Sequence, residues 1–180
     1  MRIFRAGILV LLLTVGAGIS PTLAQADPAP RYQQLTISMP TSPARLAAKF
    51  GESGSYWGGT PHSGLDFDGD TGDAVFAVAG GVVKEVGMRG SYGRTITISH
   101  GDGLASMYAH LSATEVNVGD KVFAGDRIAR MGATGNVSGS HLHLEIQLRG
   151  VPTDPYGFLF AANPGRVSDP PAWACRIYSC

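Results

Sequence analysis

The chain has 180 residues, of which 44% are apolar and 16% charged, and its 14 basic and 14 acidic residues give a formal charge of zero. This composition can build a hydrophobic core, so it excludes a disordered chain, and the absence of net positive charge argues against a nucleic-acid binder with a basic face. The length fits one ordinary domain. With 25 glycines and 11 prolines, the chain is expected to fold into short strands and tight turns rather than long helices.

The first segment, 1–26, has the layout of a secretory signal peptide. Arg2 and Arg5 precede an apolar run over 6–19, and Ala24-Gln25-Ala26 supplies the small-x-small cleavage pattern. The alternative is a membrane anchor, but a run of about 14 residues is shorter than the roughly 20 that a spanning helix needs. We therefore expect cleavage and a product that is secreted or lies in the cell envelope, with no membrane span and a formal charge of −2.

The segment 27–49 is rich in proline and is expected to form an irregular N-terminal extension. One strand is conceivable over 35–39, and 44–50 is the one stretch in which a helical period is conceivable. From Phe50 onward, short alternating or apolar runs recur between glycine turns, which favours a mostly β domain with an antiparallel sheet, long loops and little helix. The expected strands cover 65–68, 74–79, 82–86, 95–99, 104–111, 128–131 and 141–148.

The final segment, 157–180, is expected to form a C-terminal tail that contains both cysteines, Cys175 and Cys180. Two thiols on a tail make a poor metal site. Because an exported protein keeps disulfides, the pair is expected to close a small loop.

The clearest strand, 141–148, alternates without interruption. His141, His143 and Glu145 share its polar face with Gln147, and the intervening apolar residues must face the core. Glu145 could orient a neighbouring histidine, but we expect it to be a solvated strand residue.

Two further patterns contain histidine. His62 and Asp66 are four residues apart, and Gly64 allows the chain between them to curl enough to bring both to one site. His110 ends an alternating stretch and is expected to share the face of Ser106 and Tyr108, where it can line a groove.

Together these patterns supply the ligands of a catalytic zinc site. His62, Asp66 and one histidine of the pair at 141 and 143 would leave one coordination position open for water. Two remaining histidines could then carry protons and stabilise an oxyanion during amide hydrolysis. Each pattern alone is common by chance, so the argument depends on their combination, and it requires the nearest nitrogens of His62 and His143 to lie within about 6 Å.

The order of the three patterns resembles the lysostaphin- and LytM-type zinc metallopeptidases, over about residues 50–156. The matching segments are His62-Ser-Gly-Leu-Asp66, Met107-Tyr-Ala-His110-Leu and Gly139-Ser-His141-Leu-His143-Leu-Glu145. The resemblance implies a zinc metallopeptidase domain with a long groove across a small antiparallel sheet. It also implies one Zn²⁺ ion held by His62, Asp66 and His143, with His110 and His141 as catalytic residues.

The activity that the resemblance implies is hydrolysis of peptide bonds in the cross-links or stem peptides of bacterial peptidoglycan, and we expect a monomer. One alternative is a non-catalytic wall-binding or hydrolase-activator module on the same fold. Another is a carrier domain, suggested by the glycine turns of 118–128, although no lysine occupies a suitable tip. Among the remaining polar candidates, His100 is expected to pack at a turn, and Tyr56 and Trp57 either form a groove wall or anchor their loop.

Overall fold

The computed structural model describes residues 35–54 and 58–160, together with 174, 176 and 177. The expected signal peptide over 1–26, the pair Tyr56 and Trp57, and a disulfide between Cys175 and Cys180 lie outside the described residues.

Strands dominate the described chain, and most of them are short. In chain order the elements are β1 (Arg45–Ala48), β2 (Leu65–Asp68), β3 (Ala74–Phe76), β4 (Gly81–Met88), the 3₁₀ turn η3 (Gly90–Tyr92), β5 (Arg94–Gly101), β6 (Leu104–Ala109), β7 (Ala113–Thr114), β8 (Lys121–Val122), β9 (Arg127–Arg130), β10 (His141–Leu148), β11 (Val151–Thr153) and α1 (Pro155–Phe160).

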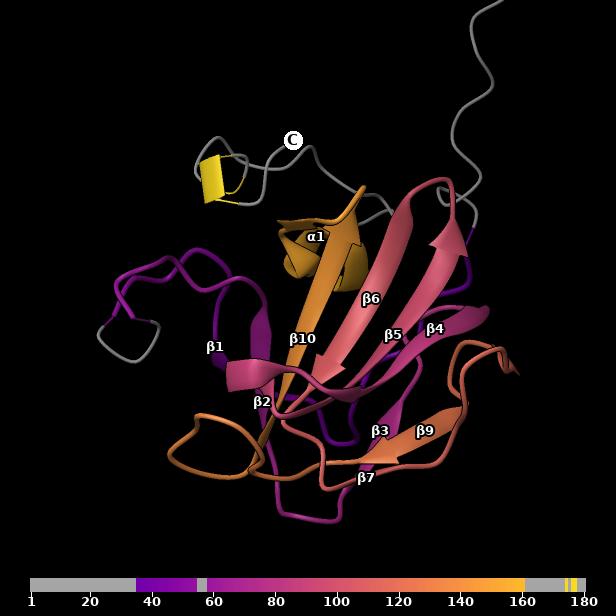
Figure 1. Cartoon of the computed structure of the whole chain (residues 1–180), viewed down its shortest axis with the longest axis horizontal. Helices are drawn as coiled ribbons and strands as arrows, with labels where there is room; N and C mark the ends of the chain where they lie inside the picture. Colours follow the sequence, from indigo (N-terminus) through magenta and orange to yellow (C-terminus); the bar gives the residue numbers. More distant parts are fainter. Residues whose placement is uncertain (1–34, 55–57, 161–173, 175, 178–180) are drawn as a thin grey trace, which may run out of the picture.

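The strands form two antiparallel sheets (Figure 1). The 8-stranded sheet has the order β1-β2-β10-β6-β5-β4-β8, and β11 pairs with the end of β10. The 3-stranded sheet has the order β3-β9-β7. The mostly β, antiparallel fold expected from the sequence is thus confirmed, and β10 lies in the interior of the large sheet with β2 on one side and β6 on the other.

The register of β10 separates a polar face from a core face. His143 pairs with Asp66 of β2 and with Ala109 of β6, whereas the next residue, Leu144, pairs with Leu65 and Tyr108. Because directly opposite residues point to the same side of a sheet, the polar groups gather on one face. The opposite face packs into a core that also takes in side chains of the small sheet; its fully buried members include Phe67, Val75, Ile96, Ile98, Ile128, Leu142 and Leu144.

Two expectations about local structure were wrong. The stretch 44–50 contains β1 instead of a helix, because its residues pair with β2 at the sheet edge and this pairing overrides a weak helical pattern. The stretch 35–39 contributes only an isolated bridge between Ile37 and Ala79. The short helix α1 had not been expected, and its apolar residues Phe158 and Leu159 are buried.

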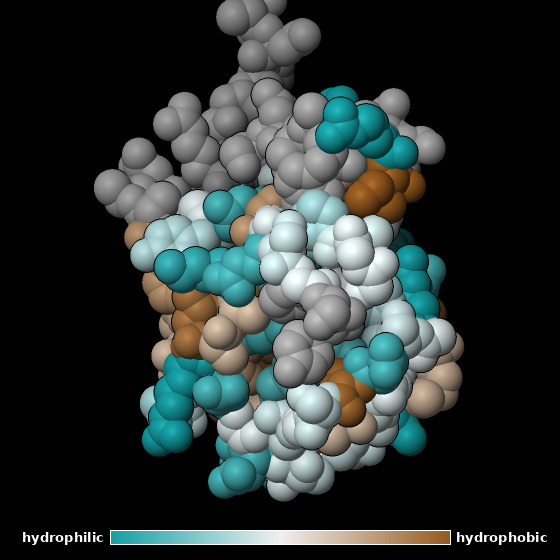
Figure 2. All heavy atoms as spheres, turned by 90° about the vertical axis from the view of Figure 1, so that its left-hand side faces the viewer, coloured by the Kyte–Doolittle hydropathy of each residue, from teal (hydrophilic) through white to brown (hydrophobic). Residues whose placement is uncertain are grey.

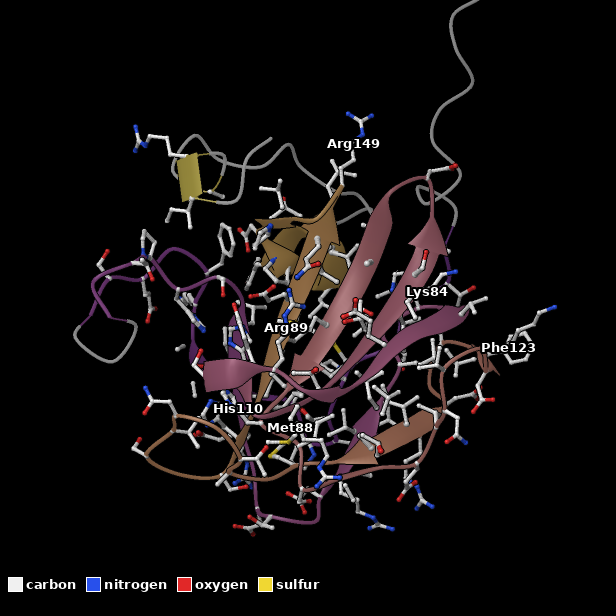
Figure 3. All side chains as sticks on the ribbon, viewed as in Figure 1. Lys84, Met88, Arg89, His110, Phe123 and Arg149 are labelled. Carbon is white, nitrogen blue, oxygen red and sulfur yellow. The ribbon has the colours of Figure 1, made fainter. Side chains whose placement is uncertain are left out.

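Apolar residues form only small patches on the face of the molecule that Figure 2 shows. Figure 2 shows the face that lies on the left of Figure 1, where pale and teal residues predominate and brown apolar residues form small patches. Two large apolar side chains are strongly exposed (both labelled in Figure 3): Met88, the last residue of β4, with 68% of its surface exposed, and Phe123, which directly follows β8, with 74%. Among the described residues, no helix has the length and apolar character needed to span a membrane.

Candidate metal centre and active-site groove

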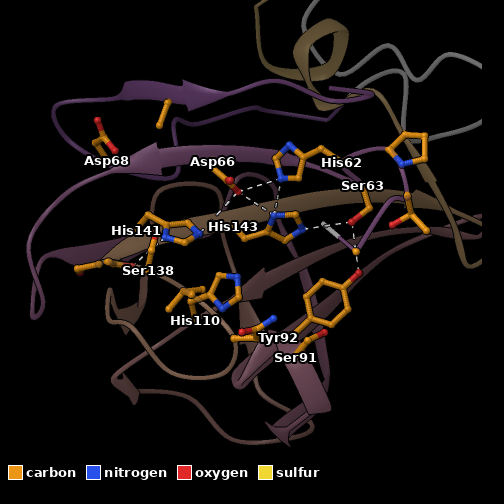
Figure 4. A pocket seen from close by; sticks show the side chains of 18 residues that line it. His62, Ser63, Asp66, Asp68, Ser91, Tyr92, His110, Ser138, His141 and His143 are labelled. Carbon is orange, nitrogen blue, oxygen red and sulfur yellow. Dashed lines mark hydrogen bonds and ion pairs between the residues drawn. The ribbon is translucent and has the colours of Figure 1, made fainter. Parts of the chain in front are cut away.

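The side chains of His62, Asp66 and His143 converge on one point (Figure 4). Asp66 Oδ1 lies 3.1 Å from His62 Nε2 and 2.8 Å from His143 Nδ1, and these two nitrogens are 3.0 Å apart. Ligand atoms that each lie about 2 Å from one zinc ion are separated by roughly 3–4 Å. The separation of the three atoms therefore suits a single small cation.

Backbone contacts place His62 opposite β10. Its N–H donates to Glu52 O and its carbonyl accepts from Gly51 N, both at 2.8 Å, which fixes the end of the preceding loop. The chain then curls through Gly64 into β2, and a Cβ at Gly64 would lie 2.3 Å from the carbonyl oxygen of Leu144. Glycine is required here by the close approach of the loop to β10, because any side chain would push the two apart.

The outer nitrogen of each candidate histidine ligand faces an acceptor. His62 Nδ1 lies 2.9 Å from Lys49 O, and His143 Nε2 lies 3.4 Å from Glu145 Oε1. A carbonyl or a carboxylate can only accept, so each ring carries a proton on that outer nitrogen. The inner nitrogens, which face Asp66, are the ones left to bind a cation.

The electrostatics of the cluster favour positive charge. Burial alone would raise the pKa of Asp66, but its contacts with the rings of His143 and His62 outweigh burial and hold the pKa of this carboxyl well below its usual range. Burial alone would lower the pKa of His143, but the hydrogen bonds to Asp66 and Glu145 raise it to about 9. Two buried or half-buried carboxylates thus stabilise a cationic ring in the cluster, and this donor set with its surplus of negative charge fits a divalent metal ion.

His110 reaches the same face by a local change of backbone direction. β6 ends at Ala109, and His110 has a φ of 62°, in the left-handed region that few non-glycine residues adopt. The expectation that His110 shares a groove-lining face with Ser106 and Tyr108 was wrong. Tyr108 is fully buried on the core side, where its hydroxyl accepts from Val78 N, and the left-handed residue turns the histidine to the other side.

His110 and His141 form a second pair beside the cluster, with ring centroids 4.7 Å apart. The Nδ1 of His110 donates to Thr134 O at 2.9 Å, and the Nδ1 of His141 donates to Gly139 O at 3.1 Å. Both rings therefore carry their proton on Nδ1 and keep an Nε2 lone pair. The Nε2 of His141 lies 3.9 Å from Asp66 Oδ1, next to the candidate metal position.

The surroundings of His110 favour its neutral form. Burial lowers its pKa, the Thr134 carbonyl opposes this in part, and the nearby ring of His143 lowers it further, to about 4. A neutral ring with a fixed tautomer can accept a proton at neutral pH.

A groove of about 800 Å³ runs over these residues, and all five side chains that the sequence singled out line it. The rest of its wall is built largely from small or polar residues contributed by three loops: Gly58, Ser91, Tyr92, Asn136, Ser138 and Gly139. The expected groove is therefore present on the polar face of the sheet.

Two residues near the site were misjudged or missed in the sequence. Glu145 is 1% exposed, so its interpretation as a solvated strand residue was wrong; its alternation with His143 was the available signal. Tyr92, whose hydroxyl donates to Glu145 Oε1 at 2.8 Å, lies in the turn η3, and no sequence pattern had marked it. His100 packs at a turn as expected, with its ring nitrogens 2.9 Å from Gly80 O and from Ser106 Oγ.

The sequence of this domain is similar to that of several known proteins. Over 115 residues the chain is 35% identical to a DD-carboxypeptidase/endopeptidase, Mpg, of Neisseria meningitidis, and this match covers 64% of the chain and 26% of the relative. Over 100 residues it is 40% identical to the murein hydrolase activator NlpD of Escherichia coli, covering 54% of the chain and 26% of the relative. The matches thus span about a quarter of the length of these relatives.

Solved structures extend the comparison to the fold. The catalytic domain of lysostaphin from Staphylococcus simulans matches with a TM-score of 0.61 and 31% identity, over 65% of this chain and 92% of that one. A zinc-containing peptidase from Vibrio cholerae matches with a TM-score of 0.59 and 29% identity, over 71% and 37% of the respective chains. The family model for peptidase family M23 matches residues 60–155, which include every candidate site residue. The chain belongs to peptidase family M23.

Proposed function

We propose that the chain is an exported zinc-dependent endopeptidase that hydrolyses peptide bonds in the cross-links or stem peptides of bacterial peptidoglycan. The observation that carries this proposal is the convergence of two different histidine pairs and one carboxylate on a single groove. Membership in family M23 and the likeness to a DD-carboxypeptidase/endopeptidase support the class of substrate.

In this proposal His62, Asp66 and His143 hold one zinc ion through Nε2, a carboxylate oxygen and Nδ1. Zinc bound there supplies a Lewis acid that activates water and polarises the scissile carbonyl. The protein's own part is to present the two inner nitrogens to the ion, because Lys49 O and Glu145 accept the protons of the outer nitrogens.

His110 and His141 manage protons on the substrate side. Their Nε2 atoms are free to accept because Thr134 O and Gly139 O occupy the Nδ1 protons. One ring takes a proton from the attacking water and the other stabilises the oxyanion or protonates the leaving amine. The pKa of His110, about 4, keeps that ring neutral at physiological pH, as a base must be.

Export is part of the proposal because the substrate lies outside the cytoplasm. The support for it is the signal-peptide pattern of 1–26. Peptidoglycan is the expected partner, and the small, polar groove wall suits a peptide with short side chains. A monomeric enzyme meets these requirements.

A non-catalytic activator of wall hydrolases is the second candidate, favoured by the relative named as a murein hydrolase activator. The complete set of five site residues in this chain supports the enzyme instead. The carrier-domain alternative has no support, because the turns of 118–128 lie inside the region matched by the M23 family model.

The test is digestion of purified cell walls with several types of cross-link, with released fragments identified by mass spectrometry. We expect new amino groups, sensitivity to EDTA and restoration by zinc. A His143→Ala variant should remain folded but lose both zinc and activity. Wall binding without released amines would support the activator, and full activity of the variant without metal would contradict the proposal.

A further inference from the structure

A carboxylate lies buried directly behind the candidate metal cluster. Glu145 follows His143 by two residues on β10 and is 1% exposed. Its Oε1 lies 3.4 Å from His143 Nε2, on the side of the ring that faces away from Asp66. A buried carboxylate is costly unless it is paired and hydrogen-bonded, and in the described part of the chain its ion pair is with His143.

Two side chains hold this carboxylate in one orientation. Tyr92 donates its hydroxyl to Oε1 at 2.8 Å, and Gln147 donates its amide to Oε2 at 2.6 Å. The two hydrogen bonds reach different oxygens of the carboxylate, and one of the donors, Tyr92, belongs to the neighbouring turn η3. Glu145 is therefore fixed by contacts that do not involve the histidine.

Ser63 also contacts the outer nitrogen of His143. Its Oγ lies 3.5 Å from His143 Nε2 and 3.3 Å from the Tyr92 hydroxyl. Because Ser63 directly follows His62, the same network connects the loop of one candidate ligand to the strand of the other (Figure 4).

We propose that Glu145 is a positioning residue for His143, and that Tyr92 holds the Glu145 carboxylate in place. The inference rests on the proposed function, because it takes His143 to bind zinc through Nδ1. A carboxylate that faces the Nε2 proton leaves Nδ1 as the nitrogen that binds the ion, orients the ring and makes it a stronger ligand. The outer nitrogen lies 3.4 Å from Glu145 Oε1 and 3.5 Å from Ser63 Oγ, and both contacts are long for hydrogen bonds.

The test compares zinc affinity among the unaltered protein, Glu145→Gln and Tyr92→Phe, measured by competition with a chelator. Glu145→Gln keeps the shape of the side chain but removes its charge, so we expect zinc binding to weaken by about 10- to 100-fold. Tyr92→Phe keeps the carboxylate and loses only its support, so we expect a smaller loss. Cobalt substitution should show shifted ligand-field bands in Glu145→Gln, a change that a purely structural role would not produce.

The matched control is Glu85→Gln, the same chemical change at a carboxylate that is 67% exposed and paired with Arg89; it should leave zinc affinity unchanged. Equal zinc affinity and identical cobalt bands in Glu145→Gln and the unaltered protein would overturn this inference but would not affect the proposed function. If Glu145→Gln fails to fold, Tyr92→Phe decides: weakened zinc binding supports the inference, and unchanged binding overturns it. A failure of the unaltered protein to bind zinc would contradict the proposed function itself, and this inference with it.

Discussion

The two histidine pairs in the groove use the same side chain in opposite ways. His62 and His143 are 1% and 4% exposed and face the carboxylate of Asp66. His110 and His141 border the open groove, and backbone carbonyls hold their Nδ1 protons. A charged acceptor raises the pKa of His143 to about 9, whereas burial without a close carboxylate partner lowers the pKa of His110 to about 4. The partner of the ring, more than the ring itself, separates a candidate ligand from a candidate proton carrier.

The largest expected effect comes from removing the carboxylate charge of Asp66, which both candidate ligand histidines face. Asp66→Asn should reduce bound zinc from one ion per chain to background and abolish wall hydrolysis, because the amide is a poor zinc ligand. Metal analysis of the purified variant provides the measurement. Asp68→Asn, two residues along β2 on the same face, should retain zinc; a zinc-loaded Asp66→Asn protein would contradict the assignment.

Changes in the second pair should separate chemistry from metal binding. His110→Ala and His141→Ala are each expected to lower the rate of wall hydrolysis by about 10²- to 10⁴-fold, the usual contribution of a general acid or base. Zinc content should stay at the level of the unaltered protein in both. If either variant lost its zinc, the division of the four histidines into two pairs would be wrong.

The rigidity of the ligand pair can be tested at Gly64. Gly64→Ala would place a Cβ 2.3 Å from Leu144 O and 2.9 Å from the His143 ring. We expect the free energy of unfolding of the metal-free protein to fall by about 1–3 kcal/mol, measured by denaturant titration. Gly87→Ala is the control, because Gly87 is exposed and has nothing within 4 Å of the added atom; equal stabilities would show that the loop can move away freely.

The most gradual expected effect is the change of zinc affinity with pH. In the metal-free protein the pKa of His143 is about 9, so the ring is protonated below that pH and must lose a proton to bind metal. Zinc affinity should therefore rise about tenfold per pH unit up to about pH 9 and then level off. Chelator competition between pH 6 and 10 measures the slope, and a flat response between pH 6 and 8 would show that Asp66 and Glu145 do not hold that proton.

Sequence reasoning predicted much of the sheet because alternation is a direct consequence of strand geometry. The strand 141–148 was expected with the bounds that the structure gives, and its alternation placed His141 and His143 on one face. The same rule failed at His110, because a single left-handed residue at the end of β6 reverses the side that alternation predicts. Such a residue gives no periodic signal in the sequence.

Contacts between distant segments account for the remaining differences between the predicted and the observed structure. The edge strand β1 exists because β2 offers it a partner, which local propensity does not reveal. The backbone carbonyls that hold the histidine tautomers belong to Lys49, Thr134 and Gly139. Any residue type supplies a carbonyl, so these positions could not be found by reading side chains.

The interior position of β10 has a consequence for how the site comes apart. His143 and Glu145 lie on a strand paired on both sides, whereas His62 ends a loop outside the sheet. Amide protons in β10 should exchange with deuterium only through global unfolding, while those of Gly51 and His62 should exchange through local opening. Release of a bound ion would then begin at the loop, with the strand half of the site still intact and ready for recapture.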